Sequence, residues 1–371
     1  MLQRIFVTGA TFFCLQLSGF AQQTATSVAL DTTAATAPTE EPKATTVISG
    51  FADSYYRYDM AKTPFNNRTS FTNSHNSFEL GMISAKVDQT FGHAAMTADL
   101  GFGRRAEEFS YADGNTRFII KQLFLSYSFK HDIKVTAGSW ATHVGYELVD
   151  AYANRNYSMS YMFSYGPFFH TGVKVEKTFG KVGIMAGIAN PTDLKSATLS
   201  NKYGIGQVSY GSSDGKFKSF LNFQGGKPVD STRYTQADLV MTYAFTDKFS
   251  LGYNGTVANY QQKELEGDGF GEASHWWGSA LYVNVNPSSW LGLTLRSEYF
   301  SDRKQFNIYA AQPEGGSVFA NTLSLNLSKD HITLIPEIRL DTATKDGFFA
   351  DKDGNGTKSA LSFLCAAIYK F

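Results

Sequence analysis

The last stretch of the chain, Ser359–Phe371, constrains the fold more than any other part of the sequence. Taken two at a time, its apolar residues fall on one face, as a β-strand requires: Leu361, Phe363, Cys365, Ala367, Tyr369 and Phe371. Most chains end in a frayed polar tail, because terminal residues rarely have anything to pack against. An apolar terminal strand needs a covered face and paired edges. A soluble sandwich could supply both, but a closed barrel in lipid does so more naturally, since closure removes the edge and lipid covers the outer face.

The residue order at this terminus resembles the C-terminal signal of bacterial outer-membrane barrels. Phe371 is terminal, Tyr369 stands two residues before it, and alternating apolar residues precede both. The resemblance implies that the barrel-assembly machinery recognises the chain through Phe371.

The N-terminus has the pattern of an export signal followed by a linker. Residues 1–21 carry one basic residue, Arg4, then an apolar run and small residues before Gln22, which is typical of a secretory signal peptide. Residues 22–46 are rich in Thr, Ala and Pro without periodicity, which predicts a disordered segment. Removal of the signal peptide leaves Cys365 as the only cysteine, so we expect no internal disulfide.

Composition excludes other classes of protein. Lys+Arg and Asp+Glu balance at 33 each, so the chain offers no basic field for nucleic acid. The mature chain has no apolar run near the roughly 20 residues that a helical membrane span requires. Low charge with abundant Tyr and Phe suits a barrel whose outside is lipid and whose rims carry aromatic girdles. We assign Trp276 and Trp277 to such a belt rather than to a binding platform.

Residues 47–371 show strand after strand with one apolar and one polar side. In Ala94–Arg105, apolar residues at even positions alternate with Thr97, Asp99 and Gly101. Short turns such as 179–181 and 246–248 alternate with long polar stretches such as 60–76, 261–273, 303–316 and 342–357, and we place the turns in the periplasm and the loops outside. This pattern predicts an all-β, transmembrane, antiparallel up-and-down β-barrel of roughly 16 strands, within about 14 to 18. A soluble β-sandwich is the alternative.

The sequence becomes specific within residues 138–172. It reads Gly-Ser-Trp-Ala-Thr-His-Val-Gly-Tyr-Glu from Gly138, Asn-Arg-Asn-Tyr-Ser from Asn154, and Tyr-Gly-Pro-Phe-Phe-His-Thr-Gly from Tyr165. Together with Ile48–Tyr56, Leu295–Tyr299 and Pro336–Arg339, these motifs resemble the OmpL-like β-barrel porin family of outer-membrane proteins, in its Bacteroidetes-type members. The resemblance spans residues 47–371 and implies an outer-membrane barrel of porin type, without naming a solute.

Charged residues stand on the polar faces of these strands. They are expected to project into one lumen, because charge on the lipid face is costly. We expect them to line the channel and screen solutes by size and charge; ion pairs that stiffen a narrow barrel are the alternative. The set is Asp53, Arg57, Asp99, Arg105, Lys134, Lys174, Glu176, Arg296, Glu298, Glu337, Arg339 and Asp341.

The long polar stretch after Trp140 is a candidate constriction loop. Long functional loops often fold over a site, and this one could turn inward and narrow the pore. An ordinary external loop is the alternative. Its candidate residues are His143, Glu147, Asp150, Arg155 and Tyr157.

Three other stretches match known motifs in residue type but lack the residues or the predicted context that those motifs need. Asp351, Asp353 and Asn355 match the first half of a calcium loop, but the twelfth position is Ser362 rather than Glu, so a plain Asp/Gly turn is preferred. The stretch 101–106 matches a dinucleotide-binding fingerprint, but we expect no helix after it, as such a site would need. The stretch 211–215 matches the nucleophile motif of hydrolases, but we place it in a hairpin between two strands rather than between a strand and a helix. The seven histidines show no metal-ligand spacing, so no metal or cofactor is predicted.

These features predict a function in the outer membrane of a Gram-negative bacterium. We expect a porin-like channel that contacts membrane lipid and passes small hydrophilic solutes or ions down their gradient, without enzymatic activity. The balanced charge predicts only a weak preference for either ion sign. The alternatives are a structural or adhesive barrel with an occluded lumen and, less favoured, an outer-membrane hydrolase with a Ser–His site.

Overall fold

The computed structural model describes residues 44–371, except 115–116, 118, 199–200 and 265–268. The predicted signal peptide and nearly all of the predicted linker lie outside the described residues. The first strand, β1, spans Thr45–Asp59, so the barrel begins two residues before its predicted start at residue 47.

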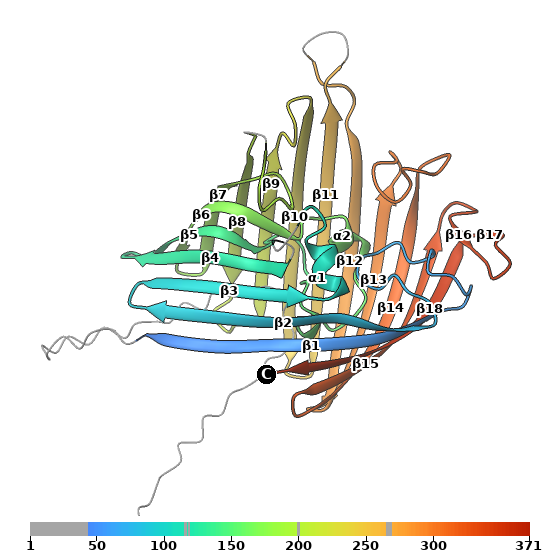
Figure 1. Cartoon of the computed structure of the whole chain (residues 1–371), viewed down its shortest axis with the longest axis horizontal. Coiled ribbons are helices and arrows are strands. Elements are labelled where there is room, and N and C mark those ends of the chain that lie inside the picture. The colour runs from blue at the N-terminus through green and yellow to red at the C-terminus, as the bar shows by residue number, and fades with distance from the viewer. Residues whose placement is uncertain (1–43, 115–116, 118, 199–200, 265–268) are drawn as a thin grey trace, which may run out of the picture.

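Sixteen antiparallel strands close into one barrel (Figure 1), which confirms the predicted fold class and strand number. Neighbours in the barrel follow the order of the sequence, and β1 pairs with the last strand to close the ring. A two-stranded hairpin, β16 (Phe349–Ala350) and β17 (Gly356–Thr357), lies in the loop before the last strand. The other strands are β2 Ser77–Phe91, β3 Ala94–Phe102, β4 Ile120–Phe129, β5 Ile133–Ala141, β6 Phe169–Phe179, β7 Val182–Ala189, β8 Tyr203–Gly211, β9 Phe217–Gly226, β10 Thr232–Thr246, β11 Phe249–Gln262, β12 Ser274–Ser288, β13 Leu291–Asp302, β14 Gly316–Lys329, β15 Ile332–Ala343 and β18 Ser359–Lys370.

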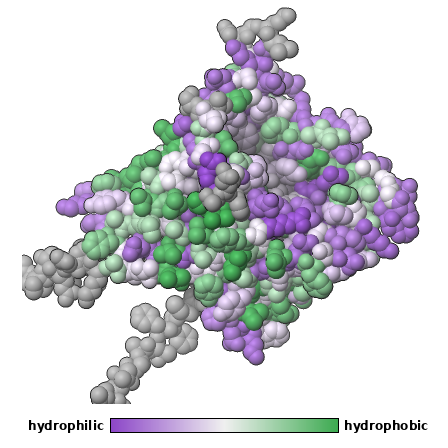
Figure 2. Space-filling view, in the orientation of Figure 1, coloured by the Kyte–Doolittle hydropathy of each residue, from purple (hydrophilic) through white to green (hydrophobic). Residues whose placement is uncertain are grey.

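The alternation of the sequence separates an apolar outside from a polar inside. On β14, Thr322 and Ser324 are fully buried within the barrel, while Leu323 between them is 43% exposed on the outside. Figure 2 shows hydrophobic residues gathered across the strands of one face and hydrophilic residues over the loops at its ends. An exposed apolar band of this kind is covered by lipid in transmembrane barrels.

Short and long connections alternate around the barrel, as predicted, except that the β9–β10 connection (227–231) is as short as a turn. Short turns such as Gly92–His93 join strands at the end where β1 starts and β18 finishes, and the long loops lie at the other end. Gly92 has φ 56, a conformation that a tight hairpin needs and that glycine adopts without strain. We refer below to the short-turn end and the long-loop end.

Aromatic side chains ring the short-turn end. Rings on β9–β11 form a continuous chain of contacts, with centroid distances of 6.5 Å for Phe217–Tyr243 and 4.6 Å for Tyr243–Phe245. At the long-loop end Trp277 is 40% exposed and packs on Tyr299. The assignment of Trp276 to the belt is wrong, however, because its side chain is fully buried inside the barrel. Neighbouring residues of a strand point to opposite faces, so only one of this pair can face lipid.

The seam between β1 and β18 includes the terminal residue. The backbone of Phe371 exchanges two hydrogen bonds with that of Gly50, at 3.0 and 3.1 Å. A Cβ atom at Gly50 would lie 2.6 Å from the Phe371 ring and 2.3 Å from the Ser84 carbonyl oxygen, so only glycine admits this approach.

Two helices lie within the ring of strands in Figure 1: α1 (Arg104–Phe109) and α2 (Tyr161–Ser164). The expectation that strand runs to Arg105 and that no helix follows residues 101–106 is wrong. β3 ends at Phe102, and α1 turns the chain inward so that Arg105 and Phe109 are buried. In the part of the chain described, no helix is both long and apolar enough to cross a membrane.

Candidate functional site

The segment between β5 and β6, residues 142–168, turns into the barrel, and we call it the inner loop. It contains α2 and a short 3-10 helix at Ala151–Ala153. Its side chains Tyr157, Met159 and Tyr161 are fully buried among inward-facing residues of β1, β12–β15 and β18. In the barrel order β13 lies eight strands from β5 in either direction. Contacts of the inner loop with β13 therefore span the whole lumen.

Glu298 on β13 holds the start of α2. Its two carboxylate oxygens accept hydrogen bonds from the backbone N–H groups of Tyr161 and Met162, both at 2.8 Å. Ser160 caps the same helix by accepting from the Phe163 N–H at 3.1 Å. The free N–H groups at a helix start need such acceptors, so a wall carboxylate completes the loop's own structure.

Glu337 on β15 binds the preceding turn in the same way. Its oxygens accept from the N–H groups of Tyr157 at 2.9 Å and Ser158 at 3.2 Å, and Ser324 donates to it at 2.7 Å. Asn156 donates to the Ser324 hydroxyl at 2.7 Å, which extends the network to β14.

Arginines of the wall bind the carbonyl groups of the loop. Arg296 Nη1 donates to Glu147 Oε1 at 2.5 Å and to the Ser158 carbonyl at 2.8 Å. Arg339 Nη1 donates to the Met159 carbonyl at 2.7 Å. Both arginines are buried, so their charges are compensated inside the protein rather than by water.

Two aspartates that the sequence analysis missed fix the ends of the inner loop. Asp238 on β10 accepts from the Gly145 N–H at 2.9 Å. Asp193, in the β7–β8 connection, accepts from the N–H groups of Phe168 at 2.7 Å and Phe169 at 3.0 Å, and burial raises its pKa to about 7. Asp238 occupies an inward position of β10, so the alternation of polar and apolar residues along that strand could have identified it. Asp193 lies in a loop, where the sequence shows no such alternation.

Lys121 on β4 was also missed and joins two predicted residues. Its ammonium lies 3.0 Å from Asp99 and 2.5 Å from Asp150 of the inner loop. On α1, Arg105 donates to the Val149 carbonyl at 3.3 Å. The inner loop thus has charged partners on β4 and α1 as well as on β13 and β15.

The predicted lumen residues differ in exposure. Lys134, Lys174 and Glu176 on β5 and β6 are only half-buried, and the Lys174 and Glu176 side chains, 3.2 Å apart, are 16% and 29% exposed. The remaining residues face inward but are buried in polar contacts with the wall, α1 or the inner loop. They are Asp53, Arg57, Asp99, Arg105, Arg296, Glu298, Glu337, Arg339 and Asp341.

The five predicted constriction residues all lie in the inner loop, and all except Asp150, whose partner Lys121 is on the neighbouring strand β4, contact strands that are not adjacent to β5 or β6. Arg155 donates to Thr294 Oγ1 at 2.7 Å and to Asn286 Oδ1 at 2.5 Å. His143 Nε2 lies 3.2 Å from the Phe223 carbonyl oxygen, and burial lowers the pKa of His143 to about 4. Glu147 pairs with Arg296, and Asp150 pairs with Lys121. The ring of Tyr157 contacts that of Tyr55, with centroids 5.4 Å apart.

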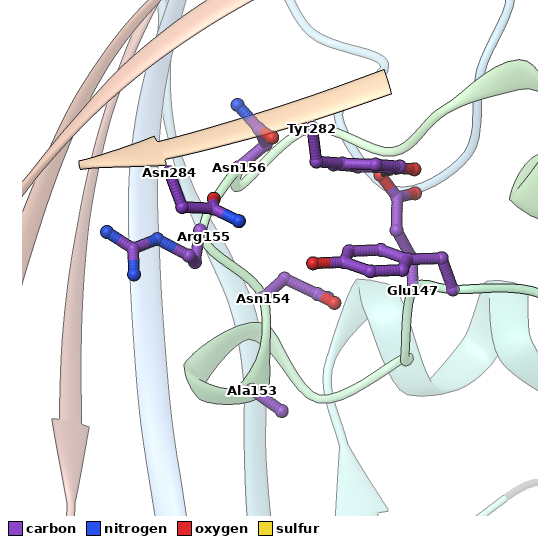
Figure 3. A pocket seen from close by; sticks show the side chains of 8 residues that line it. Glu147, Ala153, Asn154, Arg155, Asn156, Tyr282 and Asn284 are labelled. Carbon is purple, nitrogen blue, oxygen red and sulfur yellow. Dashed lines mark hydrogen bonds between the residues drawn. The ribbon is translucent and has the colours of Figure 1, made fainter. Parts of the chain in front are cut away.

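A water-sized cavity lies between the inner loop and β12. Glu147, Arg155, Tyr282 and Asn284 line it (Figure 3), and its volume is about 10 Å³. The Tyr282 ring stacks on Tyr146 with centroids 4.0 Å apart. A volume of this size holds about one water molecule, so this cavity is too small for a solute.

A much larger cavity, of about 540 Å³, opens at the long-loop end. We call it the vestibule. It is lined by rings of four strands, Tyr203, Tyr234, Tyr260 and Trp276, and by Tyr165 and Phe306 of the loops.

The calcium-like segment is the turn of the β16–β17 hairpin. Asp351 Oδ1 accepts from the N–H groups of Asp353 at 2.9 Å and Asn355 at 2.8 Å, and Lys352 pairs with Asp353 at 2.7 Å. Its oxygens thus bind the turn itself. Among the residues described, no group of three or more His, Cys, Asp or Glu side chains is arranged to hold a metal ion.

Comparison with known proteins gives a family and a fold. The family model described as "Putative beta-barrel porin-2, OmpL-like" matches residues 45–371. Comparison with curated protein sequences gives no significant match.

Several solved porin structures are similar in fold. An anion-selective porin from Comamonas acidovorans has 14% identity and a TM-score of 0.58, with 89% of this chain and 100% of that chain covered. OmpF of Salmonella typhi, in complex with daunomycin, has 8% identity and a TM-score of 0.58, with 88% and 97% covered. OmpT, an outer-membrane protein of Vibrio cholerae in a trimer form, has 11% identity and a TM-score of 0.56, with 88% and 99% covered.

The family match covers every strand of the closed barrel, and the exposed apolar band places that barrel in lipid. The chain therefore belongs to the OmpL-like β-barrel porin family and is a channel for small solutes in the outer membrane of a Gram-negative bacterium.

Proposed function

We propose that the inner loop sets the aperture of this channel and that small hydrophilic solutes pass along β5 and β6. The observation that carries the proposal is the asymmetry of the lumen. On the β12–β15 side, wall and loop are joined by buried charges and the cavity beside Tyr282 is water-sized, whereas Lys134, Lys174 and Glu176 on the other side remain accessible to water.

These three residues supply two positive charges and one negative charge to the proposed path. A mixed set of this kind orders water and screens solutes mainly by size, with a small preference for anions. Transport down a gradient needs neither a cofactor nor a catalytic residue. A hydroxyl–imidazole contact does occur, between Thr142 Oγ1 and His170 Nε2 at 3.0 Å, but the imidazole is buried at the root of the inner loop and serves to hold it there.

The occluded structural barrel is the second candidate, and the tight packing of the inner loop against β12–β15 favours it. Single-channel recording separates the two. The mature protein, refolded and shown to be folded by its heat-sensitive gel mobility, is placed in a planar bilayer. Steady current steps proportional to salt concentration are expected of a water-filled path. Silence from the folded protein would contradict the channel path proposed here and support occlusion.

A further inference from the structure

The vestibule is built from aromatic rings that converge from both strands and loops. Tyr203 on β8 and Tyr234 on β10 stack at 6.1 Å between centroids, and Tyr260 on β11 stacks on Phe306 at 5.0 Å. Tyr234, Tyr260 and Phe306 are only half-buried, so parts of their rings face the cavity. Aromatic rings at the mouth of an aqueous channel are unexpected, since polar side chains would interact better with water.

The acidic residues of the vestibule are already engaged. Glu108 accepts from the Phe71 N–H at 2.7 Å and from Arg104 Nε at 3.2 Å. Both oxygens of Asp193 are likewise bonded, to two backbone N–H groups and, at 3.2 Å, to the Tyr111 hydroxyl. A cationic solute would therefore find no free carboxylate here, and no Lys or Arg side chain lines the vestibule among the residues described.

What the vestibule offers is half-buried aromatic rings bordered by hydroxyl groups. Ser70, Ser164 and Thr192 lie in its lining together with the tyrosines. The Ser164 and Thr192 hydroxyls donate within the protein, at 2.8 Å to the Ser160 carbonyl and at 3.3 Å to Gln224 Oε1, so their oxygens remain as acceptors for ligand hydroxyls. The face of an aromatic ring carries partial negative charge and attracts the weakly positive C–H groups of a ligand, while hydroxyls bind at its edge. The uncharged hydrophilic solute that presents both a C–H face and a hydroxyl edge is a cyclic sugar.

We propose that the vestibule is a binding site for the rings of neutral sugars, of about disaccharide size, given that pockets of roughly 300–1,000 Å³ hold small ligands. The proposal names a solute class for the channel. Binding at the vestibule does not depend on the proposed function, but passage of the bound sugar through the barrel does. Binding captures the sugar at the long-loop end, and the inner loop below it limits entry to the lumen.

Calorimetry on the refolded mature protein tests the binding step, in a detergent without a sugar headgroup. Cellobiose and maltose are the probes, and sorbitol is the control solute because it has the hydroxyls of a sugar without a ring. We expect binding of at least one disaccharide and none of sorbitol. Tyr260→Ala and Phe306→Ala should each weaken binding about tenfold, as loss of a stacking ring does. Tyr253→Ala, on the outer face of β11, is the matched control and should leave binding unchanged.

Conductance measured on the same samples separates this proposal from the proposed function. Binding together with sugar-dependent block of the current supports both. A folded barrel that conducts but binds neither disaccharide, or binds sorbitol equally well, overturns the sugar site and leaves the channel intact. Ring-dependent binding by a barrel that never conducts supports the sugar site and contradicts the channel path.

Discussion

A charged residue inside this barrel acts according to its exposure. Arg296 and Glu298 are both fully buried and bonded to the inner loop, so they position protein rather than solute. Removing one partner of a buried ion pair typically costs about 3–5 kcal/mol, because the other charge is left uncompensated. Lys134 and Lys174 are half-buried, so in the proposed path they are the positive charges that solutes would meet.

The first prediction concerns ion preference. The double change Lys134→Ala and Lys174→Ala removes positive charge from the proposed path, so the reversal potential in a salt gradient should shift toward cations. Lys177→Ala is the matched control, since Lys177 lies on the outer face of β6 over the Phe179 ring. An unchanged reversal potential in the double variant would mean that ions do not pass β5 and β6.

The second prediction concerns pH and Asp193. Its folded pKa of about 7 lies above the roughly 3.9 of an unfolded aspartate. An acid with a raised folded pKa stabilises the fold below its unfolded pKa, and this contribution is lost as pH rises through about 7. Between about pH 4 and 7, stability should therefore fall by up to roughly 1.4 kcal/mol per pH unit.

Asp193→Asn should remove this dependence, because the amide oxygen can still accept the two backbone N–H groups but does not ionise in this range. The measurement is the temperature of the gel-mobility shift at a fixed heating time across pH 4 to 8. Asp214→Asn changes an exposed turn residue, so this variant should show the same pH dependence of the gel-shift temperature as the wild type. A wild-type slope in Asp193→Asn would assign the pH dependence to another group.

At the scale of elements, the inner loop is an internal part of the barrel that is fixed at its ends and along its length. Asp238 and Asp193 hold its two ends, and Glu298 and Glu337 hold its middle from the opposite wall. Many fixed points on one segment make the inner loop rigid, since local opening must break several buried bonds at once.

The third prediction is that shortening the inner loop enlarges the channel. Replacing residues 146–165 with a short Gly/Ser link should raise single-channel conductance several-fold, because the obstacle across the lumen is removed. The matched control shortens the exposed tip of the β16–β17 hairpin, residues 351–355, which should leave conductance unchanged. Equal conductance in the shortened inner-loop variant and the wild type would show that the aperture lies elsewhere.

Strands could be predicted well from this sequence and the inner loop's contacts could not. The alternation of apolar and polar residues is a local signal, so a window of about ten residues is enough to identify the two faces of β3 or β14. The bond from Glu337 to Tyr157 joins positions 180 residues apart, and no local pattern encodes it. α1 was missed because six residues are too few to show a helical period.

At the scale of the whole molecule, the closed barrel has an apolar outer surface and buried charged residues inside. Phe371 lies on its outer surface at the seam, 51% exposed, with its backbone paired to Gly50. This placement leaves the ring accessible to another protein before the barrel is in the membrane.

The fourth prediction is that Phe371→Ala impairs assembly more than stability. The backbone bonds to Gly50 do not depend on the side chain, so refolding in detergent should be little affected. The amount of heat-modifiable barrel in outer membranes of cells should fall several-fold if assembly machinery reads the terminal ring. Leu361→Ala, on the outer face of the same strand, is the control, and an equal loss in both variants would point to a general effect of packing.

The seam also fixes the order in which the molecule can form. β1 pairs with β18, so residues more than 300 positions apart in sequence must meet before the first strand has both its neighbours. Closing such a long loop is entropically costly and slow, and few local contacts compensate for it in advance. The middle of the inner loop is synthesised before β13–β15, which carry its partners Glu298 and Glu337, so it lacks these contacts until the last third of the chain arrives. Complete fixation of the inner loop and closure of the barrel are therefore late events, and a chain truncated before β18 lacks the β1–β18 seam.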